Sequence, residues 1–334
     1  MADQRSWRHG FTVLASVCCA LALSASVQHH SAPARVDASD DAMGTTFSIV
    51  LYGADRTRLQ ADADTAFEEV HRLDRLLSNY DSRSEWSAVN RGAAQHPVAV
   101  SAELFDLIAA CLDYSRRSDG AFDITVGPLM KVWGFYKGEG ALPSATEIAA
   151  ARRLIGARHV TLDARARTVA FDMPGVELDP GGIGKGYAVD RMVAILKQHG
   201  VTSARVSAGG SSIYGLGAPP DSPDGWLTPI RDPADPHHSV AEVRLKNMSL
   251  STSGGYEKFF RANGQIYAHI MDPRTGVPAR GTAAVSVMAP RTLDSEAWTK
   301  PYFVNGRAWT VSHVAARFRV FFCESGQPCG WVTP

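Results

Sequence analysis

The chain has 334 residues, of which 45% are hydrophobic and 20% are charged. This composition is that of a globular protein with enough apolar side chains for a core, and the length allows one large domain or two of medium size. Lysine plus arginine and aspartate plus glutamate both number 34, and this neutral formal charge gives no support for nucleic-acid binding.

The N-terminal segment has the pattern of a secretory signal peptide. Arg5 and Arg8 form a basic start, residues 11–27 are almost continuously apolar and small, and residues 24–26 offer a cleavage site. This order predicts a signal peptide over residues 1–30 and export to the periplasm. The alternative is an uncleaved anchor in the inner membrane, but the apolar run is slightly short of the roughly 20 residues that span a bilayer.

Downstream of this segment, helical and strand patterns are interspersed without a clean linker, so we expect residues 40–334 to form one domain. The expected elements, in chain order, are a strand at 45–51, helices at 58–77, 101–115 and 145–154, a hairpin at 160–178, a helix at 187–199, and strands at 204–207, 240–245, 283–288 and 318–323. They form no regular βαβ repeat, which favours an α+β fold with mixed sheets and flanking helices over a doubly wound sheet.

Three cysteines follow the predicted signal peptide. Cys111 shares a helical face with leucine and isoleucine side chains between residues 104 and 112, which is typical of a core position. Cys323 and Cys329 lie six residues apart, and in an oxidising compartment they are expected to form a disulfide, with two reduced thiols as the alternative. Neither state indicates a zinc site, because no second Cys or His pair has ligand spacing.

The most informative stretch is a glycine-rich turn within residues 177–190, ELDPGGIGKGYAVD, between an apolar strand and an amphipathic helix. Such a turn directs several backbone N–H groups and the positive end of a helix dipole at one place, which favours an anion. Lys185 adds a positive charge and Asp179 a carboxylate. The spacing matches neither a Walker A loop nor a Rossmann fingerprint, and a purely structural turn is the alternative.

Six further polar segments are each explained, taken singly, as turn chemistry. They are residues 43–46, 78–90, 120–125, 207–212, 251–257 and 269–276. The second of them is expected to be a polar loop whose aromatic side chains, Tyr80 and Trp86, pack against a ring of a ligand. For Trp86, core packing is an equal alternative.

Taken together, in this order and spacing, the segments resemble the ApbE family of FAD:protein FMN transferases over residues 42–306. The resemblance implies an α+β fold that binds one FAD, with magnesium at its diphosphate. It implies a reaction that places FMN on a Thr or Ser of a partner protein and releases AMP. The family's acceptors are extracytoplasmic redox subunits, which agrees with an exported protein.

The resemblance also assigns site residues. Cofactor contacts are expected at Met43, Tyr80, Ser84, Asp123, Asp179, Gly182, Lys185, Gly209, Ser253, His269 and Arg274, and catalytic roles at Asp272, His269 and Lys300. The glycine-rich turn and Lys185 would hold the diphosphate, while the aspartates orient a cation, a ribose or the acceptor hydroxyl. His269 would bond a flavin or phosphate oxygen, with a structural histidine as the alternative.

The chain departs from the family at the metal. There, a helix supplies an Asp and, four residues later, a Thr as ligands, with a backbone carbonyl of the glycine-rich turn, here Gly184. This chain has Glu296 and Lys300 at those positions. Residues four apart share a helix face, so we expect both to face the site, with the Lys300 ammonium in the place of magnesium. An ordinary surface ion pair is the alternative. Ser211 also replaces a usual Asp.

Three functions remain open from the sequence. The first is FMN transfer from FAD to a protein. The second is an FAD diphosphatase, in which water replaces the acceptor hydroxyl. The third is a flavin-binding protein without catalytic activity.

Overall fold

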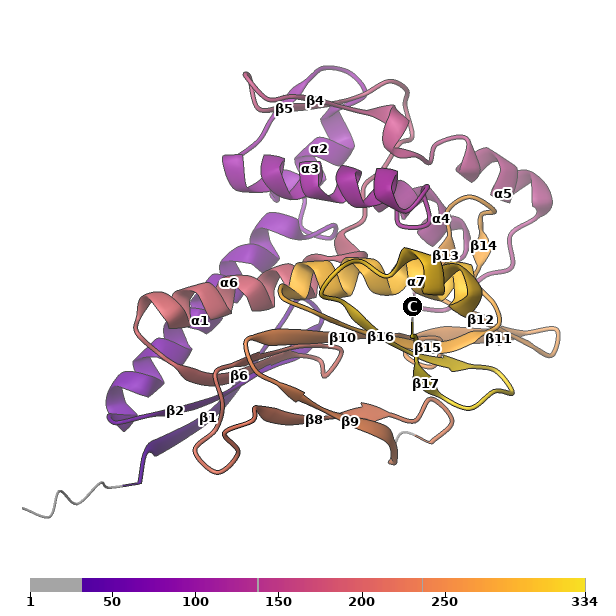
Figure 1. Cartoon of the computed structure of the whole chain (residues 1–334). Coiled ribbons are helices and arrows are strands. Elements are labelled where there is room, and N and C mark those ends of the chain that lie inside the picture. Colours follow the sequence, from indigo (N-terminus) through magenta and orange to yellow (C-terminus); the bar gives the residue numbers. More distant parts are fainter. Residues whose placement is uncertain (1–31, 137, 236, 334) are drawn as a thin grey trace, which may run out of the picture. The chain divides into compact units, whose positions relative to one another are not determined.

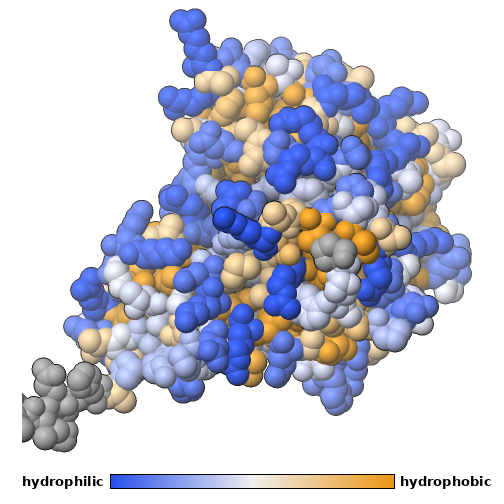
Figure 2. Space-filling view, in the orientation of Figure 1, coloured by the Kyte–Doolittle hydropathy of each residue, from blue (hydrophilic) through white to orange (hydrophobic). Residues whose placement is uncertain are grey.

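The computed structural model describes residues 32–136, 138–235 and 237–333, and the unit that they form spans Pro33–Pro334. The predicted signal peptide lies outside the described residues. Within those residues, no helix combines the length and the apolar character needed to cross a bilayer. The face shown in Figure 2 is mostly hydrophilic, with apolar side chains in several separate patches.

An eight-stranded sheet carries the fold, with the order β1-β2-β6-β7-β10-β15-β16-β17 and antiparallel pairing between all neighbours. Its strands are β1 (Ala34–Ala42), β2 (Thr45–Gly53), β6 (Ser203–Ala208), β7 (Ser212–Leu216), β10 (Met248–Gly254), β15 (Thr282–Ala289), β16 (Arg319–Glu324) and β17 (Gly330–Trp331). The antiparallel order agrees with the α+β class expected from the sequence.

Three helices cover one face of the sheet, namely α1 (Arg56–Leu77), α6 (Gly184–Gln198) and α7 (Thr292–His313). A hairpin of β8 (Trp226–Arg231) and β9 (Ser239–Leu245) covers the other face, as Figure 1 shows. Its Trp226 and Val243 pack in one buried cluster with Leu250 and Met288 of the sheet. Both faces are therefore apolar, and the central strands β10 and β15 are buried along nearly all of their length.

A second layer of short elements lies beyond the helices in Figure 1. It consists of α2 (Glu85–Gly92), β3 (Val98–Ala99), α3 (Ala102–Arg117), α4 (Gly127–Val132), α5 (Ala145–Arg152), β4 (Val160–Asp163) and β5 (Thr168–Phe171), with the 3-10 turns η1 (Ile124–Val126) and η2 (Ala157–His159). Two small hairpins, β11 (Phe259–Ala262) with β12 (Gln265–Ala268) and β13 (Met271–Asp272) with β14 (Val277–Pro278), complete the chain. One apolar cluster joins this layer to α7.

The expected helices and strands are present with ends shifted by at most three residues, except that the hairpin expected at 160–178 ends at Phe171. Cys111 is fully buried, and Cys323 and Cys329 form a disulfide. The polar loop expected at 78–90 is partly wrong, because its second half is α2. Ser84 caps that helix, its Oγ accepting the Ser87 N–H at 2.9 Å, and the helix buries Trp86 completely. A short amphipathic turn inside a polar segment gave too weak a periodicity to be recognised.

Helices α6 and α7 hold each other by reciprocal hydrogen bonds at their N-termini. The Asp190 carboxylate of α6 accepts the N–H groups of Thr292 at 2.7 Å and Leu293 at 2.9 Å. In return, the Glu296 carboxylate of α7 accepts the N–H of Gly186. Each carboxylate thus satisfies donors that a helix start leaves without an intrahelical partner, and burial raises the pKa of Asp190.

We expect Gly186→Ala to destabilise the fold by about 2 kcal/mol, because an added methyl overpacks the junction of α6 and α7. A Cβ at this position would lie 2.6 Å from the Thr292 carbonyl oxygen and 2.7 Å from Glu296 Oε2. Urea denaturation measures the effect. Gly330→Ala is the control, since nothing lies within 4 Å of its added Cβ. Equal stability of the two variants would contradict the close packing described here.

Candidate active site

The glycine-rich turn is shaped by Asp179. Its Oδ1 accepts the Gly181 N–H at 2.7 Å and so caps the 3-10 turn η3 (Pro180–Gly182), after which α6 begins. Its Oδ2 accepts the Tyr136 hydroxyl at 2.5 Å and the Asn79 amide at 3.5 Å. Burial raises the pKa of Asp179. The carboxylate predicted to contact the cofactor is therefore occupied by protein donors, and it fixes the turn.

Glu296 and Lys300 both face this turn from α7, as the sequence predicts. Glu296 is only 3% exposed and its carboxylate is engaged by Gly186, so the alternative of a surface ion pair is wrong. The Lys300 ammonium donates to the backbone carbonyl of Glu296 at 2.9 Å, not to its carboxylate. A Cβ added to Gly182 would lie 3.7 Å from Lys300 Cε, so this side chain lies directly over the turn.

Two more lysines, Lys185 and Lys258, lie near this part of the site. Lys185, in the first turn of α6, donates to Ser211 Oγ at 2.7 Å. Among the described residues, no carboxylate oxygen lies close enough to the ammonium nitrogen of Lys185, Lys258 or Lys300 for an ion pair, which requires 4.0 Å or less. Burial lowers the pKa of Lys300 to about 8; the nearby Glu296 opposes this shift and the positive charge of Lys185 adds to it. Among the described residues, these ammonium groups therefore lie near one another without a direct ion pair to a carboxylate.

His269 follows β12 and adds a neutral imidazole to the group. Its Nδ1 lies 3.0 Å from the carbonyl oxygen of Lys258, so Nδ1 must carry the proton and donate. Burial lowers the pKa of His269 to about 4, against the hydrogen bond to Lys258, with further lowering from the charges of Lys258, Lys300 and Lys185. At neutral pH, Nε2 is therefore free to accept a proton or a hydrogen bond.

The predicted pair Asp272 and Arg274 forms a closed unit. The Arg274 Nε donates to Asp272 Oδ1 at 2.9 Å and its Nη2 to Oδ2 at 3.1 Å, while Nη2 also reaches Asn305 Oδ1 at 2.8 Å. Asn305 precedes Gly306, where α7 kinks with a φ of 77°. This unit joins the β13 turn to α7.

Serine hydroxyls of β10 hold α7 on the sheet. Ser249 and Ser251 bond Ser295 Oγ at 2.9 and 2.7 Å, and Ser253 bonds Thr299 Oγ1 at 2.7 Å. Ser253, predicted to contact the cofactor, is thus occupied by α7. This polar seam orients the helix face that carries Glu296 and Lys300.

Two predicted contacts lie in turns at the end of the sheet. Met43 has a φ of 52° in the turn between β1 and β2, and its Cε lies 3.2 Å from where a Cβ on Gly184 would stand. Gly209, with a φ of 57° between β6 and β7, donates its N–H to the Thr46 carbonyl at 2.9 Å. The glycine-rich turn and the ends of these strands therefore lie together.

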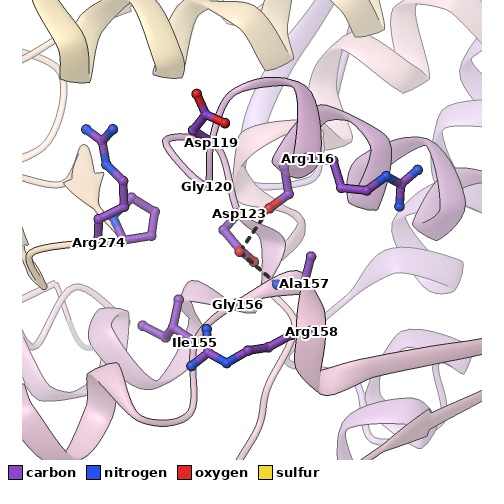
Figure 3. Close-up of a pocket in the computed structure, with 11 residues that line it drawn as sticks. Arg116, Asp119, Gly120, Asp123, Ile155, Gly156, Ala157, Arg158 and Arg274 are labelled. Atoms are coloured by element: carbon purple, nitrogen blue, oxygen red, sulfur yellow. Dashed lines mark hydrogen bonds between the residues drawn. The ribbon is translucent and has the colours of Figure 1, made fainter.

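Asp123 ties three segments together, namely α3, η1 and η2. Its oxygens accept Ser115 Oγ at 3.1 Å, the Thr125 N–H at 2.8 Å and hydroxyl at 2.6 Å, and the Ala157 N–H at 3.1 Å. Figure 3 shows it beside a cavity of about 320 Å³, with Arg116 and Arg274 on opposite sides. Its protein partners account for the conformation of this region without a ligand.

Comparison with known proteins matches residues 43–320 to the ApbE family. The chain belongs to the ApbE family. An FAD:protein FMN transferase of Klebsiella pneumoniae is 33% identical over 263 residues, covering 78% of this chain and 79% of that protein. One of Treponema pallidum is 33% identical over 282 residues, with coverage of 79% and 77%.

Solved structures agree with this assignment. The ApbE protein of Thermotoga maritima matches with a TM-score of 0.82 and 30% identity, covering 89% of this chain and 97% of its own. The flavinyl transferase ApbE of Pseudomonas stutzeri matches with a TM-score of 0.80 and 29% identity, covering 91% and 95%. The fold expected from the resemblance is confirmed.

Magnesium, which the ApbE resemblance implies, does not fit the residues present. This ion requires oxygen ligands in near-octahedral geometry. Here the predicted set is the Gly184 carbonyl, a Glu296 carboxylate that already accepts an N–H, and the Lys300 ammonium, which cannot ligate a cation. In the described part of the chain, no group of three or more His, Cys, Asp or Glu residues is placed to hold a metal.

Sequence reasoning missed four residues of this ApbE site. Tyr136 bonds Asp179, and its ring lies edge-on to the 80% exposed Tyr80 at 6.3 Å. Asp190 lies inside the glycine-rich segment, but the sequence assigned it no role. Lys258 directly follows the polar segment 251–257, and Thr299 directly precedes Lys300. Only proximity in the chain to a selected motif pointed to them, because their partners are distant in sequence.

We expect the stability of the protein to fall between pH 6.5 and pH 4 through His269. Its folded pKa of about 4 lies below the ordinary value near 6.5, so the unfolded chain binds the proton first and this stability, present above pH 6.5, is lost as the pH falls. Because the ring is half-buried, we expect a loss of about 1 kcal/mol between pH 7 and pH 5.

Urea denaturation at both pH values measures this effect. His269→Gln should lose about 1 kcal/mol less than the wild type on acidification, while the exposed His96→Gln should behave as the wild type does. If His269→Gln keeps the full pH dependence, the imidazole is not held neutral by the fold.

Proposed function

We propose that this chain is an FAD:protein FMN transferase, which cleaves FAD and attaches FMN to a Thr or Ser of another protein with release of AMP. The observation that carries the proposal is the set of ammonium groups around the glycine-rich turn, beside a neutral imidazole. Such a group suits a diphosphate, which is anionic and hydrogen-bonds backbone N–H donors at a helix start. The curated relatives carry the same activity in their names.

The reaction is a phosphoryl transfer from the FAD diphosphate to the acceptor hydroxyl. The acceptor hydroxyl oxygen forms a bond to the FMN phosphorus, and the bond from that phosphorus to the bridging oxygen breaks. AMP leaves with the bridging oxygen and its electron pair, and the hydroxyl proton passes to His269 Nε2. Catalysis of such a step consists mainly of positioning and electrostatic stabilisation, which Lys185, Lys300 and the turn provide.

Substrate binding makes His269 a better base. Its pKa is low mainly because of burial, and the positive charges of Lys258, Lys300 and Lys185 lower it further. An anionic diphosphate among those lysines offsets their charge, and a nearby negative charge raises the pKa of a histidine. The imidazole therefore gains proton affinity when FAD is present.

The proposal places the protein outside the cytoplasm, in the periplasm. The predicted signal peptide supports export, and the Cys323–Cys329 disulfide is of the kind that persists in oxidising compartments. The acceptor is then an extracytoplasmic redox subunit that carries a suitable Thr or Ser. Attachment to the membrane through the N-terminus is the alternative form of the same proposal.

We expect the mature protein to bind one FAD and, when given FAD and an extracytoplasmic protein fraction of its source, to release AMP and produce a protein band with covalent flavin. Calorimetry measures the first, and chromatography of AMP with in-gel fluorescence after denaturation measures the others. AMP release without a fluorescent band would indicate the diphosphatase instead. Absence of FAD binding would contradict the proposal.

We expect Lys185→Met to weaken FAD binding at least tenfold, because Lys185 starts the helix that faces the diphosphate. Lys197→Met is the matched control, since Lys197 lies exposed at the other end of α6.

Asp272→Ala should reduce FAD binding or transfer without unfolding the protein, because it releases Arg274 and the β13 turn. Unchanged flavin affinity and transfer in both Lys185→Met and Asp272→Ala would show that the site lies elsewhere.

A further inference from the structure

In the described part of the chain, the half-buried ammonium groups of Lys185 and Lys300 form no ion pair with a carboxylate. Among the residues that the structure describes, the Lys300 ammonium donates to a backbone carbonyl, and that of Lys185 donates to a serine hydroxyl. A buried charge without a counter-charge is costly in a folded protein. A site that keeps such groups is prepared for an anion that comes from outside the chain.

The nearest carboxylates are occupied by other tasks. Glu296 accepts the N–H of Gly186, and Asp179 accepts Gly181, Tyr136 and Asn79. Both serve to hold the turn and α6 in place. With one Glu296 oxygen and both Asp179 oxygens engaged by protein donors, and with an ammonium where a further oxygen ligand would be needed, the near-octahedral coordination of a divalent cation is incomplete here.

We infer that the Lys300 ammonium, together with Lys185, takes the place of a divalent cation at the diphosphate, so that this chain binds and cleaves FAD without bound magnesium. The inference rests on the proposed function and names the form of its substrate, which is metal-free FAD.

The geometry of Lys300 suits this task. An ammonium has three donors, and one of them is used by the Glu296 carbonyl one helical turn earlier, which fixes the position of Nζ. The other two remain for phosphate oxygens over Gly182, the residue against which Lys300 Cε lies. Lys185 lies in the first turn of α6, and its ammonium donates to the neutral Ser211 hydroxyl, which leaves its positive charge uncompensated.

A fixed ammonium provides the electrostatic part of what a metal ion provides. It attracts the diphosphate in the ground state, and it stabilises the negative charge that develops on the oxygen that leaves with AMP. Because it is held by the fold, it needs no binding step of its own. The ordering of the site is then independent of the free magnesium concentration.

The test compares FAD binding by calorimetry in EDTA and in excess magnesium, with ADP as a probe that lacks the flavin. Wild-type dissociation constants for both should agree within about threefold in the two buffers. Lys300→Met should bind FAD at least tenfold more weakly in both, because the charge is lost and nothing can replace it. Lys197→Met serves as the control for a general loss of positive charge and should match the wild type.

Lys300→Thr separates the role of charge from that of shape. Its hydroxyl restores an oxygen ligand beside Glu296, so we expect FAD binding that is at least tenfold weaker in EDTA and recovers in magnesium. Thermal melting of each variant shows whether it is folded. If Lys300→Met does not fold, the wild-type comparison and Lys300→Thr still decide the question.

Two results would overturn the inference. One is a wild-type affinity that falls tenfold or more in EDTA and returns with magnesium. The other is a folded Lys300→Met that binds FAD as the wild type does. If the wild type binds FAD in neither buffer, the proposed function itself fails and the inference falls with it, which is a distinct outcome.

Discussion

The contact between Gly186 and Glu296 is the constraint on which the site depends. A carboxylate of α7 accepts the N–H of α6, and in return Asp190 of α6 accepts two N–H groups of α7. The helices can approach this closely because position 186 has no side chain. Their mutual position then places Lys300, one turn beyond Glu296, over the glycine-rich turn.

The sheet also fixes the position of α7, through hydrogen bonds from strand β10. Alternate residues of a strand point to the same face, so Ser249, Ser251 and Ser253 of β10 form a row of hydroxyls that meets α7. Buried hydroxyls require partners, and the row therefore permits only one register of the helix on the strand. The face of α7 that carries Lys300 is in this way also held by hydrogen bonds between neutral hydroxyl groups.

Several residues chosen from the sequence have structural tasks that only their partners reveal. Ser84 caps α2, Asp123 joins three segments, and Asp179 fixes the glycine-rich turn. A polar residue beside a glycine has the same appearance in a sequence whether it binds a ligand or a backbone N–H. The Glu296 and Lys300 positions were placed correctly on one helix face. The alternative of a surface ion pair between them is wrong, because the Glu296 carboxylate accepts the Gly186 N–H of α6.

The sequence by itself determined the mixed α+β class, most of the helices, four of the eight strands of the large sheet, the glycine-rich turn and the order of motifs that marks the family. These properties follow from side-chain periodicity and local backbone preferences, which depend on neighbours in the chain. Only the tertiary structure decided which polar groups are occupied, which ammonium groups lack counter-charges, and why the pKa values of His269 and Lys300 are low. Burial and charge proximity arise from segments far apart in sequence, so no local pattern can specify them.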